Sequence, residues 1–293
     1  MAFGILMGLL ASASWAFANV FIQRASRALG AFRALVWALA SGGLALLPVA
    51  LALDQRSVSL GSAGLIGWLI VAPLAAVLAY TSMFFAVERG RLSVVVPIMS
   101  SWSVIAAVIS LMILGETVRR TQLAGTGAVV VGVLVIARFA QREAGADGAA
   151  PRTSGGHLSA VGMSALTALG FGVLVPAIDR LSPALGRLGA VSFVLLVDLV
   201  LWLPVAAAGR LDVRPPSRRA WPLVLAAGAF ETIGFVWISL GIARAPVAVV
   251  SPFAGLSSAF TVLYAWMVLG ERPARPVLVG AALVCGGVVL LSL

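Results

Sequence analysis

The chain has 293 residues, of which 61% are hydrophobic and only 10% are charged, and its mean hydropathy is +1.11. Soluble domains contain about 45–50% apolar and about 25% charged residues, so a soluble fold of this length could not bury so much apolar surface. The composition therefore excludes an ordinary soluble enzyme. It indicates a helical membrane protein, because about 20 apolar residues cross the bilayer core as a helix.

The net charge of +10 arises from twenty basic residues that are all arginine. Such an excess would suggest nucleic-acid binding in a soluble protein. Here the arginines lie mostly between apolar runs, so we interpret them as anchors at lipid headgroups and expect no nucleic-acid partner. The single cysteine, Cys285, excludes an intrachain disulfide, and together with a single histidine, His157, it argues against a structural zinc site. We therefore expect neither a metal nor a cofactor.

Apolar runs separated by short polar connections predict an all-α polytopic membrane protein with ten transmembrane helices. The expected spans are 2–22, 32–53, 64–87, 92–114, 121–139, 157–178, 188–208, 221–243, 247–269 and 276–293. The first span has no basic segment before it and is too long for a signal peptide, so we expect a retained helix.

The chain divides into two halves that repeat one another. Residues 141–156 are rich in Gly, Ala, Pro and Ser, which is typical of a flexible linker between a first five-helix repeat (1–140) and a second (157–293). A shift of 155 positions pairs Arg89 with Arg244, Pro97 with Pro252, Leu114-Gly115-Glu116 with Leu269-Gly270-Glu271, Gly125 with Gly280 and Gly132 with Gly287. Apolar composition alone would not produce a register of Pro, Gly, Glu and Arg.

The number of spans in each repeat predicts how the two halves are oriented. A five-helix unit crosses the membrane an odd number of times, so the second copy enters from the opposite side and the repeats are inverted. Inverted repeats recur in secondary transporters, which bind substrate near the midplane between the halves. Duplication can also simply enlarge a scaffold, but we favour transport.

Several motifs resemble those of the EamA-type transporters of the drug/metabolite transporter superfamily. They are Ser14-Trp15-Ala16-Phe17-Ala18-Asn19, Phe85-Ala86-Val87-Glu88-Arg89-Gly90, and Leu-Gly-Glu after the fourth and ninth spans. Ala16 departs from the family, where glycine is common. The resemblance covers essentially the whole chain and implies ten helices in two inverted repeats. It also implies export of amino acids or similar metabolites, with the aromatic amino acid exporters the most similar type, but no motif marks the substrate.

Polar and aromatic side chains within four spans are candidates for lining a substrate cavity, because unpaired polar groups in a membrane need a reason. In the first span, Ser12, Trp15 and Asn19 share one helical face. The other candidates are Tyr80 and Phe84 in the third span, Ser100, Ser101, Trp102 and Ser103 in the fourth, and Ser257, Thr261 and Tyr264 in the ninth. Each serine alone is more often structural, since hydroxyls on membrane helices bond to their own backbone.

Two carboxylates lie deep within predicted spans, Asp198 in the seventh and Glu231 in the eighth. An intramembrane acid is a candidate proton carrier or a partner for a cationic group, while the alternative is a structural role. We favour function for Glu231, which has an aromatic surrounding that includes Trp237, and leave Asp198 open. Position 76, the repeat equivalent of Glu231, is alanine, so this role is not symmetric.

Prolines and charged residues at equivalent places near the span ends suggest further roles. Pro97 and Pro252 occupy equivalent places near the start of the fourth and ninth spans, where bending would suit gating. Glu116 and Glu271 lie beside arginines, and we expect helix-end ion pairs there. More arginines lie in the odd-numbered connections than in the others, which places both termini outside, whereas the family resemblance implies that both are cytoplasmic.

The sequence thus predicts a multi-pass secondary transporter of the inner membrane, not an enzyme, that exports amino acids or similar small metabolites by alternating access. Its expected partners are the lipid bilayer and a small-molecule substrate, with proton coupling and a monomeric state as open expectations. A proton-coupled exporter of lipophilic cations is the alternative. A membrane-embedded enzyme or a structural partner protein is a third reading, but no metal cluster or activated nucleophile supports catalysis.

Overall fold

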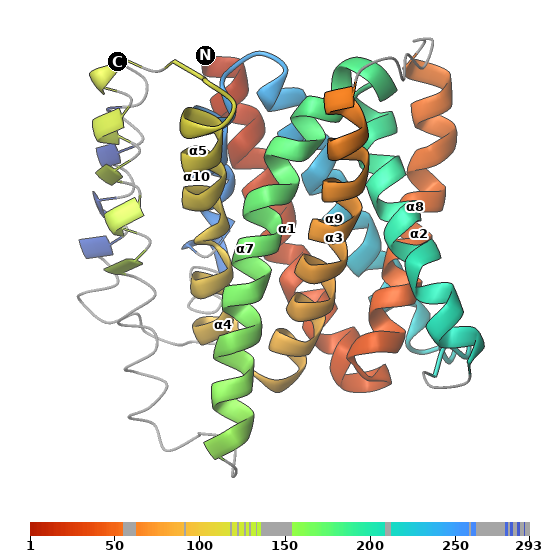
Figure 1. The fold of residues 1–293 in the computed structure, drawn as a ribbon. Coiled ribbons are helices and arrows are strands. Elements are labelled where there is room, and N and C mark those ends of the chain that lie inside the picture. The colour runs from red at the N-terminus through yellow and green to blue at the C-terminus, as the bar shows by residue number, and fades with distance from the viewer. Residues whose placement is uncertain are drawn as a thin grey trace.

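The computed structural model describes residues 1–54, 63–90, 92–117, 154–208, 212–257 and 259–261, with scattered positions in 119–135 and 279–290. The principal elements of this described part are all helices. They are α1 (Ala2–Leu29), α2 (Ala31–Leu53), α3 (Ala63–Arg89), α4 (Leu92–Met99), α5 (Trp102–Met112), α7 (Ser154–Leu185), α8 (Arg187–Ala207), α9 (Trp221–Ile242) and α10 (Val247–Ala254) (Figure 1).

Six of these helices, α1, α2, α3, α7, α8 and α9, are long and apolar enough to cross a membrane. They coincide with the predicted spans one, two, three, six, seven and eight, which confirms a multi-pass helical protein. Hydrocarbon offers no hydrogen-bond partners for backbone N–H and C=O groups, so a membrane-spanning segment must pair these groups internally, as a helix does. Most of the predicted linker 141–156 lies outside the described residues, and the fifth and tenth spans are described only in part.

The predicted fourth span is two helices rather than one. A turn at Ser100-Ser101 separates α4 from α5, and α10 in the ninth span ends before a turn at Gly255-Leu256. The two turns occupy equivalent positions of the repeat, and a proline precedes each by one helical turn. Proline disturbs the turn before it rather than the turn after it, so each break lies just beyond a segment that is already weakened. At each turn a backbone hydrogen bond spans three residues instead of four. Ser101 N–H donates to Ile98 C=O (3.1 Å), and Leu256 N–H donates to Phe253 C=O (3.2 Å).

Glycines at equivalent places allow the first two helices of each half to follow one another without a loop. Gly30, between α1 and α2, has φ = 87°, and Gly186, between α7 and α8, has φ = 79°. A side chain is strained in this left-handed region, so glycine is suited to both corners.

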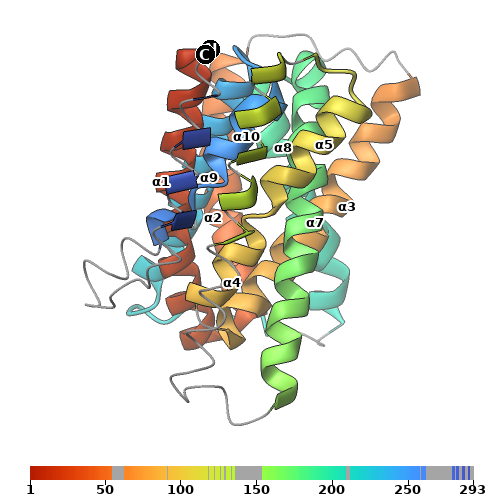
Figure 2. The same ribbon diagram turned by 90° about the vertical axis from the view of Figure 1, so that its left-hand side faces the viewer.

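The long helices of the two halves pack in equivalent pairs. α1 lies along α9, α3 lies along α7, and α2 packs against α8. Figure 2 shows α4, α5 and α10 between α1 and α7, where α10 contacts both α1 and α5 and α5 contacts α7. The interior between the halves is therefore bounded by helices from both.

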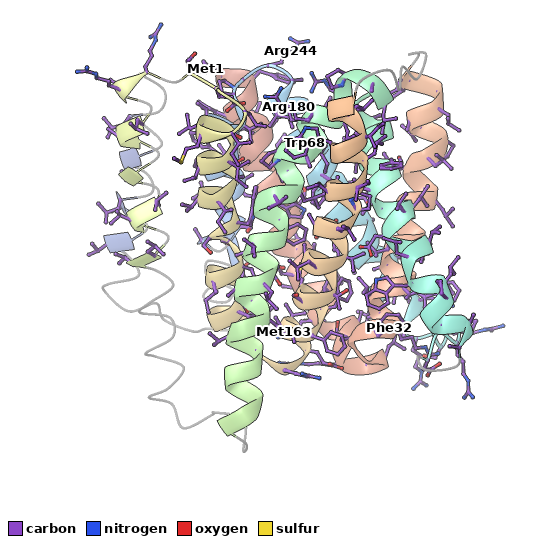
Figure 3. The ribbon with its side chains drawn as sticks, in the orientation of Figure 1. Met1, Phe32, Trp68, Met163, Arg180 and Arg244 are labelled. Carbon is purple, nitrogen blue, oxygen red and sulfur yellow. The ribbon has the colours of Figure 1, made fainter. Side chains whose placement is uncertain are left out.

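Carboxylates at the helix ends bind backbone N–H groups of the other elements. Glu116 accepts hydrogen bonds from Val247 N–H (2.9 Å) and Ala248 N–H (3.0 Å) at the start of α10. Asp54 binds Gly189 N–H (2.7 Å) at the start of α8, as acids do at helix N-termini. For Glu116 we expected an arginine ion pair, and the structure adds these two backbone donors at the start of α10 as its partners. The end of the molecule that carries Met1 also carries Arg180 and Arg244 (Figure 3).

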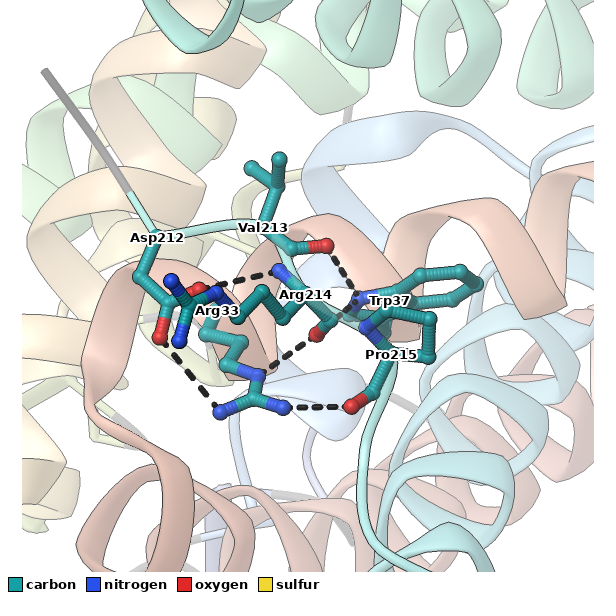
Figure 4. A network of polar contacts seen from close by, with 6 residues as sticks. All are labelled: Arg33, Trp37, Asp212, Val213, Arg214 and Pro215. Carbon is teal, nitrogen blue, oxygen red and sulfur yellow. Dashed lines mark hydrogen bonds and ion pairs between the residues drawn. The ribbon is translucent and has the colours of Figure 1, made fainter. Parts of the chain in front are cut away.

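The opposite end carries the one ion pair seen among the described residues. Arg33 forms it with Asp212 at 3.5 Å and also donates to the carbonyls of Arg214 and Pro215. The Trp37 indole donates to the carbonyls of Val213 and Arg214, both at 3.2 Å. Figure 4 shows these two side chains of α2 holding the segment before α9.

Candidate substrate cavity

A cavity of about 410 Å³ lies between the two halves. Its walls combine apolar and aromatic surface with a few polar groups, the composition typical of small-molecule sites. Six helices (α1, α3, α4, α5, α7 and α9), the turn between α4 and α5, and the segment after α10 contribute to it. The lining residues are Trp15, Asn19, Met83, Val96, Met99, Ser100, Trp102, Phe171, Val175, Glu231, Phe235 and Ser257.

Aromatic rings form much of the wall. Trp15 meets Trp102 edge to face with ring centroids 5.6 Å apart, and meets Phe235 at 5.1 Å. Phe171 continues the wall beside Phe235 at 5.9 Å. Edge-to-face pairs of this kind hold one another in place, so the wall is a packed surface rather than a set of free side chains.

The indole of Trp15 is held between α1 and α9. Its N–H donates a hydrogen bond of 3.3 Å to the backbone carbonyl of Glu231. Beneath the ring lies Gly234, where a β-carbon would overlap the indole. At the equivalent crossing of α3 and α7 a β-carbon on Gly170 would lie 2.7 Å from the backbone nitrogen of Ala79. The two crossings are equally close, but only one of them carries a large side chain into the cavity.

Glu231 is the acid of the cavity. Its side chain is 7% exposed, and among the described residues it forms no ion pair with an arginine. Asn19, one turn after Trp15 on α1, is also buried and adds an amide to the lining. A carboxylate and an amide against aromatic faces can bind an ammonium group through charge and through cation–π contact.

Two serine hydroxyls in the cavity lining join the fourth and ninth spans. The Oγ atoms of Ser100 and Ser257 are 3.3 Å apart, so the turn between α4 and α5 meets the residues that follow α10. Thr261 donates to the carbonyl of Ser257 at 2.7 Å, and Ser12 donates to the carbonyl of Leu9 at 2.9 Å. The last two hydroxyls are therefore satisfied by their own helices and not directed at a ligand.

The structure brings together six of the predicted site residues in this lining, namely Trp15, Asn19, Ser100, Trp102, Glu231 and Ser257. Thr261 is buried beside Ser257, Pro252 is buried in α10, and Trp237 packs half-buried against the core. Tyr80 lies behind the wall, where its ring contacts Phe171 edge to face at 5.2 Å. Tyr264 and the side chain of Pro97 lie outside the described residues.

The sequence did not mark five of the lining residues, which are Met83, Val96, Met99, Phe171 and Val175. Apolar side chains on a membrane helix look alike whether they face lipid or a cavity, so hydropathy carries no signal for them. Phe235 was expected among the aromatic residues around Glu231, and it is also the repeat equivalent of Tyr80.

Asp198 does not line this cavity. It is fully buried on α8, and its Oδ1 accepts a hydrogen bond of 3.1 Å from the indole N–H of Trp202, one turn later. Among the described residues no group of three or more His, Cys, Asp and Glu side chains is positioned to bind a metal ion.

Comparisons with known proteins agree with this architecture. The model of the EamA-like transporter family matches residues 2–138 and 158–293. No curated protein matches the chain. A solved structure, titled only as the crystal structure of a protein, is 17% identical and superposes with a TM-score of 0.72 over 98% of this chain and 94% of its own, which shows a shared fold. Because the family match extends over both halves, the chain belongs to the EamA-like transporter family.

Proposed function

We propose that this family member is a secondary transporter of the inner membrane that exports amino acids or similar small metabolites by alternating access. Ten spans in two inverted repeats, with bounds near 1–140 and 157–293, would move around the cavity. The observation that carries the proposal is the cavity itself, which takes residues from both halves and combines an acid, an amide and hydroxyls with an aromatic wall.

The arrangement of polar groups suits a zwitterion. Glu231 and the faces of Trp15 and Trp102 offer a place for an ammonium group. The hydroxyls of Ser100 and Ser257 lie where α5 begins, and the start of a helix favours a carboxylate. Discontinuous helices of transporters use their N-termini in this way. Under alternating access the breaks beside Pro97 and Pro252 would act as hinges.

A second candidate function is proton-coupled export of lipophilic cations. It is favoured by one observation, that the described residues of the lining include the acid Glu231 and no arginine. In that reading, drug and protons would compete for the same carboxylate. The hydroxyls near α5 would then have no charged group to bind.

Three analogues separate the two functions. In proteoliposomes, uptake of labelled L-phenylalanine would be challenged with unlabelled L-phenylalanine, with phenethylamine, which lacks the carboxylate, and with 3-phenylpropanoate, which lacks the amine. The zwitterion proposal expects both truncated analogues to inhibit about tenfold more weakly or worse, because each leaves a polar partner unpaired. Phenethylamine inhibiting as well as L-phenylalanine, with cationic-dye resistance lost in Glu231→Gln cells, would establish the cation exporter instead.

A further inference from the structure

Two buried acids lie on neighbouring helices, α8 and α9, and only Glu231 lines the cavity. Asp198 on α8 is 0% exposed and Glu231 on α9 is 7% exposed. Among the described residues neither forms an ion pair with an arginine. Two uncompensated carboxylates in a membrane interior are costly, so they must be neutralised for part of any working cycle.

The other charged groups on the helices around these acids are engaged elsewhere. Those on the described parts of α1, α2, α3 and α7 lie toward the helix ends. Arg27 and Arg180 donate to the carbonyls of Gly90 and Leu114. Arg33 holds the segment before α9, and Glu88 accepts from Ala31 N–H. The remaining ones on these helices are Arg24, Arg89 and Asp179. On α8 itself, Arg187 is the first residue, about three turns before Asp198, and it donates to the carbonyl of Ser239. Glu231 is therefore the charged neighbour relevant to Asp198.

Tyr80 on α3 lines a second cavity together with Glu231. It is fully buried, and α3 packs against α8, the helix that carries Asp198. Its hydroxyl faces the Glu231 carboxylate without a well-formed hydrogen bond, and Oδ2 of Asp198 has no hydrogen-bond partner among the described groups. A buried hydroxyl without a partner loses free energy in a purely structural role, so its position needs another explanation.

This second cavity joins Tyr80 to Glu231 and extends toward α8. It is lined by Tyr80, Glu231 and Thr232 together with apolar residues that include Leu195, one turn before Asp198. Glu231 lines both this cavity and the larger one. The indole N–H of Trp202 donates to Oδ1 of Asp198 and so orients this carboxylate, while Oδ2 has no partner among the described groups.

We infer that Glu231, Tyr80 and Asp198 form a proton relay, in which Asp198 is a second proton site behind the substrate cavity. A protonated Glu231 passes its proton to the Tyr80 hydroxyl oxygen, and the original Tyr80 proton passes to Oδ2 of Asp198, directly or through water in the second cavity. Glu231 ends as a carboxylate, Asp198 as a neutral acid and Tyr80 unchanged. The relay rests on the proposed transport function and gives it a coupling ion.

Tyr80→Phe is the decisive variant, because it removes only the unpartnered hydroxyl. A structural role predicts unchanged or higher thermal stability and unchanged transport. The relay predicts that net flux driven by a pH gradient falls by roughly tenfold or more, while exchange of labelled for unlabelled L-phenylalanine at saturating concentration is retained. Asp198→Asn should show the same division. Ser110→Ala, which removes another buried hydroxyl without a partner from α5, is the matched control and should change neither flux.

A measurement made without substrate distinguishes failure of the relay from failure of the transport proposal. Infrared difference spectra of the purified protein across pH report the carboxylic C=O stretches of Asp198 and Glu231, which Asp198→Asn and Glu231→Gln assign. The relay predicts that Asp198→Asn and Tyr80→Phe each change the pH at which the Glu231 band titrates. A Glu231 band that titrates identically in wild type and in both variants would overturn the relay, even if exchange is robust. So would gradient-driven flux in Tyr80→Phe within about twofold of wild type.

Discussion

The indole N–H of Trp15 donates a hydrogen bond to the backbone carbonyl of Glu231 across 3.3 Å, and so joins α1 to α9 beside the cavity. The bond fixes the aromatic wall relative to the acid, because the Trp15 ring also meets Phe235 edge to face. The equivalent crossing of α3 and α7 has Gly170 in place of the tryptophan. The cavity wall is thus asymmetric, although the two helix crossings that carry it occupy equivalent places in the two halves.

Trp15→Phe tests whether this bond positions the cavity wall. The variant keeps an aromatic ring and removes the donor, so the free energy of unfolding should fall by about 1 kcal/mol. The KM for exchange should rise severalfold, because the wall loses its fixed orientation beside Glu231. Trp37→Phe is the control, since it removes an indole donor at the end of the molecule. Equal rises in KM for the two variants would contradict the role assigned to Trp15.

Gly234→Ala tests the close approach of α1 and α9. The added methyl group would overlap the Trp15 ring, and overpacking of this kind costs about 1–3 kcal/mol. We expect a lower thermal midpoint in detergent and reduced exchange. Gly67→Ala on α3 meets no atom within 4 Å and should be neutral or slightly stabilising. A neutral Gly234→Ala would show that the crossing is looser than described.

Glu231→Gln tests whether the acid carries protons. The amide keeps the shape and can still hydrogen-bond, so the protein should fold with normal stability. Net transport driven by a pH gradient should fall roughly tenfold or more, whereas exchange at saturating substrate should survive, because exchange moves no net proton. Lost yield or thermal stability with unchanged gradient dependence would assign a structural role. Full gradient-driven activity at normal stability would remove Glu231 from the mechanism.

Glu116→Gln tests the contact between the connection after α5 and the start of α10. The carboxylate binds two backbone N–H groups, and losing its charge at a helix start should cost about 1–2 kcal/mol of stability. The repeat makes Glu271 the equivalent of Glu116, so Glu271→Gln should have a similar effect. Asp212→Asn removes an exposed ion pair and should cost less than about 0.5 kcal/mol. If Glu116→Gln, Glu271→Gln and Asp212→Asn lowered stability equally, the contact of Glu116 with the start of α10 would contribute no more than an exposed ion pair.

Hydropathy was sufficient to predict the helical membrane fold, because a run of apolar residues long enough to span a bilayer has few alternatives. It did not predict the turn at Ser100-Ser101, because serines are tolerated within membrane helices and the fourth span as a whole is apolar enough to be continuous. The equivalent turn at Gly255-Leu256 shows that the register of the prolines carried this information. Comparison of the two repeats therefore predicts such breaks in a helix better than hydropathy does.

The candidate site could be predicted in part. Trp15, Asn19 and Glu231 stood out because polar groups in a membrane helix need partners, and all three line the cavity. Tyr80 was grouped with them for the same reason, yet it faces a second cavity behind the wall. Which side of a helix faces which cavity depends on how α3 packs on α7, and no single-helix pattern contains that information.

Substrate counterflow in proteoliposomes tests the central claim, transport through the cavity between the halves, most directly. Vesicles loaded with an unlabelled amino acid would be diluted into a trace of its labelled form, over a panel that includes aromatic amino acids, threonine and cysteine. The account predicts transient accumulation of label for at least one panel member, reduced in Trp15→Phe and abolished in protein-free vesicles. Folded protein that accumulates no member of the panel above the protein-free level would contradict the proposed export of amino acids.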